Sequence, residues 1–116
     1  MTNAYRDFLL MYLILDLFND DNPNENVIAY LSDANPYMRR GEYSLDIVVF
    51  REFKEKYDKF DNHEEYSYEF LKEYLKNLDY YVGVYELFLT ITKEEYLRYC
   101  EEVLTNQREL LKEDFL

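Results

Sequence analysis

Glycine and proline are unusually scarce in this chain, which has two of each among 116 residues. These two residue types most often interrupt helices and form tight turns, so their scarcity favours helices joined by short connections. In several segments, apolar residues also recur at three- and four-residue spacing, which is the period of an amphipathic helix. The sequence therefore predicts an all-α protein.

The most apolar segment lies near the N-terminus, where a helix is predicted from about Asn3 to Phe18. Phe8 to Leu15 is an unbroken apolar run, and apolar residues lie almost all round this helix, as in a helix buried at the centre of a domain. The run is much shorter than the roughly 20 residues that span a bilayer, and it lacks the flanks of a signal peptide. We expect one compact domain, residues 1–116, in which five to six helices surround this one, with no membrane association.

Local start signals place the next two helices. Asn22-Pro23-Asn24-Glu25 predicts a helix start with Asn22 as its cap, and a turn is expected over residues 32–36. Ser44 is expected to cap a longer helix in which apolar residues recur up to Phe60.

Two further segments have the pattern of a capping box at a helix start, Asn62 to Glu65 and Thr92 to Glu95, and the second is the stronger. Between them, the stretch 80–91 is rich in β-branched and aromatic residues, which suits a strand. No second strand is evident to pair with it, and a lone strand leaves its backbone groups unsatisfied. We therefore predict a helix there, with an extended segment as the alternative.

The charge is strongly acidic, with 25 aspartates and glutamates against 13 lysines and arginines, a formal net charge of −12. Such a surface does not bind nucleic acid directly, because phosphate contacts need clustered bases. It suits a basic protein partner, and residues 61–116 carry more of the excess acid than residues 1–60. A single cysteine, Cys100, rules out an internal disulfide and fits a reducing, cytoplasmic location.

No catalytic, cofactor-binding or metal-binding residue is predicted. One cysteine and one histidine are too few for a structural zinc site, and two isolated glycines form neither a P-loop nor a dinucleotide fingerprint. Cys100 lies on the apolar stripe of the last helix and is expected to be a buried, inert thiol. His63 lies beside two glutamates in a helix first turn and is expected to be exposed.

Fourteen tyrosines give the chain its most suggestive functional pattern. Tyr57 and Tyr74 fall on apolar stripes and are expected in the core, whereas others alternate with acids, as interface anchors do. The predicted function is a non-enzymatic acidic protein-binding module, of the inhibitor, immunity or antitoxin kind, that docks on a basic partner. Its predicted partner-binding residues are Tyr80, Tyr81, Glu94, Glu95, Tyr96, Tyr99, Glu101 and Glu102.

Three alternatives stay open at this point. The acids could mimic nucleic acid and inhibit a DNA- or RNA-binding protein, in which case binding should fall steeply with salt. The apolar run from Phe8 to Leu15 could instead lie at a subunit interface of a self-associating protein such as a homodimer. A small enzyme that uses carboxylates alone would need a pocket in which two or more acids converge with perturbed pKa values.

Overall fold

The computed structural model describes residues 3–21, 23–34, 45–78, 81 and 83–106, with only the backbone described at residues 45–48. The described residues form six α-helices and one short 3₁₀ helix, and none of them is in a strand. In chain order these are α1 (Asn3–Asp21), α2 (Glu25–Ala34), α3 (Leu45–Lys59), η2 (Glu65–Ser67), α4 (Tyr68–Lys76), α5 (Val84–Leu89) and α6 (Lys93–Asn106). The predicted all-α bundle is confirmed.

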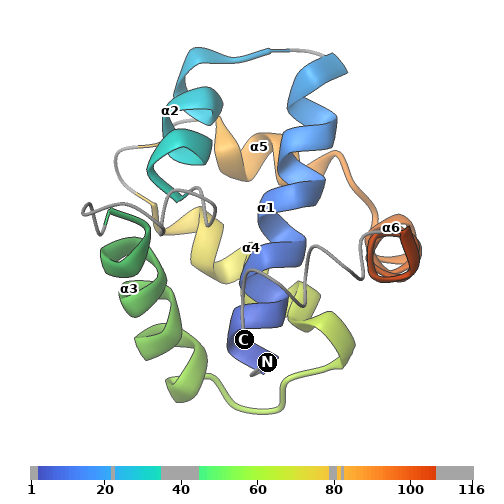
Figure 1. Cartoon of the computed structure of the whole chain (residues 1–116). Coiled ribbons are helices and arrows are strands. Elements are labelled where there is room, and N and C mark those ends of the chain that lie inside the picture. The colour runs from blue at the N-terminus through green and yellow to red at the C-terminus, as the bar shows by residue number, and fades with distance from the viewer. Residues whose placement is uncertain (1–2, 22, 35–44, 79–80, 82, 107–116) are drawn as a thin grey trace.

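α1 is the central helix of the bundle (Figure 1). α2 and α3 pack along one side of it and α6 packs on the other, while η2 and α5 also contact it. The run from Phe8 to Leu15 is buried, apart from Leu13, which is half-buried. Full burial of each large apolar side chain stabilises the fold by about 1.5–3 kcal/mol. The prediction of a buried apolar N-terminal helix is confirmed.

Aromatic rings hold the helices around α1 together. Phe53 on α3 is fully buried and meets three rings edge-on: Phe8 of α1 at 5.1 Å, Phe70 of α4 at 5.3 Å and Tyr74 of α4 at 4.9 Å between ring centroids. Edge-to-face pairs at this separation add about 0.5–1.5 kcal/mol each beyond area burial. The predicted core positions of Tyr57 and Tyr74 are also confirmed.

The start of α2 differs from its prediction by two residues. Asn24, and not Asn22, caps the helix, because its Oδ1 accepts the N–H groups of Asn26 at 2.9 Å and Val27 at 3.2 Å. Asn22 itself lies outside the described residues. The helix continues through Ala34, so the expected turn begins later than residue 32. The rest of that turn, and the cap at Ser44, lie outside the described residues.

The two predicted capping boxes had opposite outcomes. At Thr92 the box is present: the N–H of Glu95 donates to Thr92 Oγ1, and the N–H of Thr92 donates to Glu95 Oε1, both at 3.1 Å. The box over Asn62 to Glu65 is wrong, because Glu64 makes no capping hydrogen bond and α4 begins only at Tyr68. In the segment that precedes α4, the backbone takes positive φ angles at Asn62, Tyr66 and Ser67.

The ambiguous stretch 80–91 contains a helix, α5, shorter than predicted. Gly83 precedes it with a φ of 102°, which a residue with a side chain rarely adopts. The side chain of Asn24 lies against Gly83, so a Cβ there would also crowd the start of α2. Among the described residues, no helix has both the length and the apolarity required to cross a bilayer.

Candidate functional site

Three of the predicted partner-binding acids lie on the outer surface of α6. Glu94, Glu101 and Glu102 are exposed. Glu95 is engaged in the cap of α6, where hydrogen bonds from the backbone and the hydroxyl of Thr92 lower the pKa of its carboxyl. The structure thus brings three acids together on one helix and gives the fourth a local structural role.

The predicted tyrosine anchors lie deeper than a partner surface requires. Tyr96 is fully buried, so its ring is part of the core and does not belong to the partner-binding surface predicted from the sequence. Tyr99 is half-buried with its ring edge-on to Phe18 at 5.2 Å. Tyr81 is half-buried and donates its hydroxyl to Asp33, and Tyr80 lies outside the described residues.

The other described tyrosines are also covered, and no tyrosine among the described residues is exposed. Several hydroxyls are already engaged inside the molecule: Tyr57 donates to Asp7, Tyr66 to Glu101, Tyr68 to the carbonyl of Ile91 and Tyr81 to Asp33. A buried phenol needs such a partner. The phenol rings therefore pack the core of a chain that has no tryptophan.

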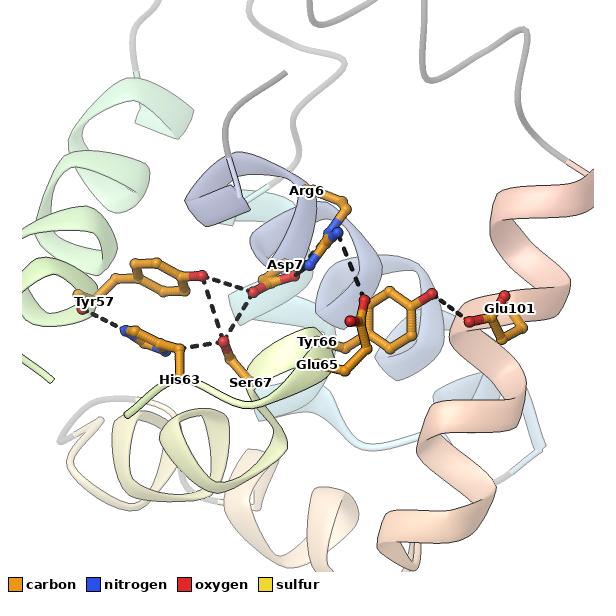
Figure 2. Close-up of polar contacts among 8 residues, drawn as sticks. All are labelled: Arg6, Asp7, Tyr57, His63, Glu65, Tyr66, Ser67 and Glu101. Atoms are coloured by element: carbon orange, nitrogen blue, oxygen red, sulfur yellow. Dashed lines mark hydrogen bonds and ion pairs between the residues drawn. The ribbon is translucent and has the colours of Figure 1, made fainter. Parts of the chain in front are cut away.

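A buried carboxylate lies at the centre of the polar contacts shown in Figure 2. Asp7, on α1, is only 1% exposed. Its Oδ1 accepts from Arg6, with both Nε and Nη2 at 3.1 Å. Its Oδ2 accepts from the hydroxyls of Tyr57 and Ser67, each at 2.9 Å. Burying a charged group is costly unless it is paired and hydrogen-bonded, and here both oxygens are satisfied.

His63 continues this network from Ser67 to the backbone of Tyr57 (Figure 2). Its ring stacks on that of Tyr57 at 3.8 Å, its Nδ1 lies 2.9 Å from Ser67 Oγ, and its Nε2 lies 2.7 Å from the carbonyl oxygen of Tyr57. The expectation of an exposed histidine is therefore wrong: the side chain is half-buried, with both ring nitrogens engaged. We call Arg6, Asp7, Tyr57, His63 and Ser67 the Asp7 network.

The Asp7 network contains an aspartate, a serine and a histidine, but their order differs from that of a catalytic triad. In a triad the carboxylate orients the histidine, and the histidine activates an accessible serine. Here Ser67 is 1% exposed and donates directly to Asp7. The arrangement instead joins three parts of the chain, α1, the end of α3 and η2.

The backbone before α4 is strained in order to place Ser67. Tyr66 and Ser67 have φ angles of 61° and 56°, in the left-handed region that costs a residue with a side chain about 1–2 kcal/mol. The sequence reasoning missed this cluster. Its one visible signal is an aspartate directly before the apolar run of α1, but its hydroxyl partners follow 50 and 60 residues later.

Cys100 is fully buried in α6, as predicted. Burial raises the pKa of its thiol to about 12, and the thiol is therefore protonated at neutral pH.

A pocket of about 300 Å³ lies between the C-terminal half of α1 and α2, and we call it the α1–α2 pocket. Its walls combine acidic, amide and apolar side chains: Tyr12, Asp16, Asn19, Asp20, Pro23, Ile28, Leu31 and Ser32. Asp16 is exposed overall, but partial desolvation raises the pKa of its carboxyl, and the nearby carboxylate of Asp20 raises that pKa further. Sequence reasoning missed this pocket, although Asp16 and Asp20 are four residues apart on a predicted helix and therefore share a face.

A second cavity, of about 250 Å³, lies between α2 and α5, and Glu86 is its one acidic side chain. Within the part of the chain that the structure describes, no three histidine, cysteine or acidic side chains gather as a metal site would require. Comparison with protein-family models, with curated proteins and with solved structures finds no match to this chain.

Proposed function

We propose that this chain is a non-enzymatic protein-binding module of the inhibitor or antitoxin kind, which docks on a basic protein partner. The observation that carries the proposal is the outer surface of α6. Glu94, Glu101 and Glu102 are exposed there, and no base among the described residues forms an ion pair with them. Carboxylates on one face that form no ion pair attract a basic surface over long range and speed the encounter.

The acids that flank α6 are less available to a partner. Glu64 forms an ion pair with Lys93, Glu65 lies 3.8 Å from Arg6, and Glu69 lies 3.8 Å from Lys72. These bases partly cancel the negative charge near η2 and α4. The exposed carboxylates that stay outside ion pairs among the predicted partner-binding residues are therefore those of α6.

The depth of the tyrosines changes the expected character of the binding. Since Tyr96 is in the core and Tyr81 and Tyr99 are half-buried, the carboxylates have to supply most of the specificity. Recognition led by charge weakens with salt, because ions screen exposed charges beyond roughly 10 Å at 0.1 M ionic strength. The run from Phe8 to Leu15, on which the alternative of self-association was based, is covered within the chain apart from the half-buried Leu13.

Capture of partners from a lysate of the source cells, at low and at high salt, tests the proposal. We expect a basic protein that binds at low salt and is lost at high salt. Calorimetry with that protein should show at least about tenfold weaker binding for Glu94→Gln/Glu101→Gln/Glu102→Gln, a loss of about 1.4 kcal/mol. Glutamine at position 101 still accepts the hydroxyl of Tyr66, so the fold is preserved.

The matched control removes the same charge elsewhere, through Glu52→Gln/Glu55→Gln/Glu73→Gln on the exposed surfaces of α3 and α4. It should bind nearly as tightly as the parent chain. Equal losses in both triple variants would mean that net charge matters and the α6 surface does not. If the captured protein binds nucleic acid, and nucleic acid competes with this chain for it, this chain inhibits its partner by mimicking nucleic acid.

A further inference from the structure

The α1–α2 pocket is strongly negative for its size. Asp16 and Asp20 line it from successive turns of α1, and no base among the described residues pairs with either. The pocket also lies at the C-terminal end of α1, where the helix dipole adds negative potential. No base lies in the last turn of α1 to offset it. The pocket therefore favours a cation, and this chain supplies none from its described part.

The opposite wall of the pocket is apolar. Ile28 is 47% exposed, which makes it one of three exposed large apolar side chains in the described part of the chain. Pro23 and Leu31 continue this wall. A ligand that fills the pocket therefore needs a hydrocarbon portion to cover Ile28 as well as a charged end to meet the aspartates.

Asn19 also lines the pocket and supplies a third kind of contact. Its side chain is nine-tenths buried, and its Oδ1 accepts the N–H of Asn24 at 3.1 Å, which fixes the connection between α1 and α2. Its amide nitrogen forms no hydrogen bond with a described residue. Among the described residues, Tyr96 Oη is the fully enclosed side-chain polar atom that lacks a partner, so the Asn19 nitrogen is not fully enclosed. Those N–H groups are free to donate to a carbonyl oxygen of a bound chain.

We propose that the α1–α2 pocket receives a lysine or arginine side chain of a basic protein partner. Long basic side chains combine a hydrocarbon stem with a charged head, which matches the apolar wall and the two aspartates. The amide of Asn19 donates to the backbone carbonyl of the inserted residue. This inference rests on the proposed function, to which it adds a specific anchor on α1 and α2, away from α6.

The test uses a tri-lysine peptide blocked at both termini and needs no identified partner. Amide chemical-shift changes in the intact protein should concentrate at residues 16–20 and 28–32 as the peptide is added. The same peptide with glutamine in place of lysine should leave these signals unchanged. Asp16→Asn/Asp20→Asn should weaken the binding by about tenfold or more, and Ile28→Ala by about threefold. All three substituted positions are exposed, so the variants should fold.

Glu52→Gln/Glu55→Gln is the matched control, because it removes two exposed charges from α3 and leaves both the pocket and the α6 surface intact. It should bind the peptide as the parent chain does. Shift changes spread equally over α6 and the pocket, or binding unaffected by Asp16→Asn/Asp20→Asn, would overturn the pocket assignment. Shift changes at the pocket with Ca²⁺ or Mg²⁺, and none with the peptide, would also overturn it in favour of a metal.

The two proposals can fail separately. Once a basic partner is identified, Asp16→Asn/Asp20→Asn should reduce its affinity as well as that of the peptide. A partner whose affinity depends on α6 and is indifferent to Asp16 and Asp20 would leave the proposed function standing and remove the pocket as its anchor. Peptide binding at the pocket without any basic protein partner in the lysate would remove the proposed function.

Discussion

Asp7 shows how a single residue can hold distant parts of a small helical domain together. Its two carboxylate oxygens accept from Arg6, Tyr57 and Ser67, so α1, α3 and η2 share one acceptor group. All of these donors point at the carboxylate, and no other group in the network replaces it. The position therefore needs a side chain that only accepts hydrogen bonds.

Replacing Asp7 with asparagine should destabilise the fold by about 3 kcal/mol, the usual cost of breaking a buried charged pair. An asparagine has one oxygen, and its NH₂ group would face either the donors of Arg6 or the hydroxyls of Tyr57 and Ser67. Urea unfolding of the variant measures this change. Asp58→Asn, which removes an exposed ion pair with Lys54, is the control and should change stability by no more than about 0.5 kcal/mol. Similar losses in both variants would contradict the role given to Asp7.

At the scale of the helices, local sequence signals succeed where no distant contact competes with them. The capping box at Thr92 forms as predicted, because both of its bonds lie within four residues. At Asn62 to Glu65 the same pattern fails, because Ser67 donates its hydroxyl to Asp7 and the backbone before α4 takes positive φ angles to place it there. That outcome depends on a contact 60 residues away, which a local motif does not contain.

Thr92→Ala should therefore destabilise the protein by about 1 kcal/mol, the typical cost of losing an N-cap. The N–H of Glu95 would lose its acceptor, while the bond from the N–H of Thr92 to Glu95 Oε1 would remain. Thermal unfolding followed by circular dichroism measures the change. Thr105→Ala, near the other end of α6, removes only a hydroxyl that donates to the carbonyl of Glu101, and its effect should be within about 0.5 kcal/mol. An equally small effect at Thr92 would show that the box is dispensable.

At the scale of the whole molecule, periodicity predicted the all-α bundle and its buried first helix, because both follow from where apolar residues recur. The candidate site was less predictable. The sequence placed Glu94, Glu101 and Glu102 on one helix, but alternation with acids also suggested that Tyr96 is a surface anchor, and it is buried. Composition shows how many rings a chain has, and only the packing of all the helices decides which rings are covered.

Burial of these rings makes the molecule sensitive to alkali. Burial raises the pKa values of Tyr74, Tyr81 and Cys100 to about 12, above ordinary values of 10 for tyrosine and 9 for cysteine. The folded state favours the neutral forms of these groups. Their contribution to the free energy of unfolding is therefore complete below about pH 9 and is lost as the pH rises towards 12. Tyrosinate absorbance and circular dichroism should therefore change together in that range. Ionisation of every tyrosine near pH 10 with the helices intact would contradict this.

The Asp7 network also has a consequence for synthesis of the chain. α1 leaves the ribosome before α3 and η2, so the hydroxyls that satisfy Asp7 follow 50 and 60 residues later. At about 5–20 residues per second, that interval lasts roughly 3–12 s. During this time, the apolar run of α1 from Phe8 to Leu15 has neither its aromatic cover nor the partners of the buried charge beside it. The nascent chain is then at its most vulnerable to aggregation, and a chaperone that binds apolar segments would have its best opportunity to act.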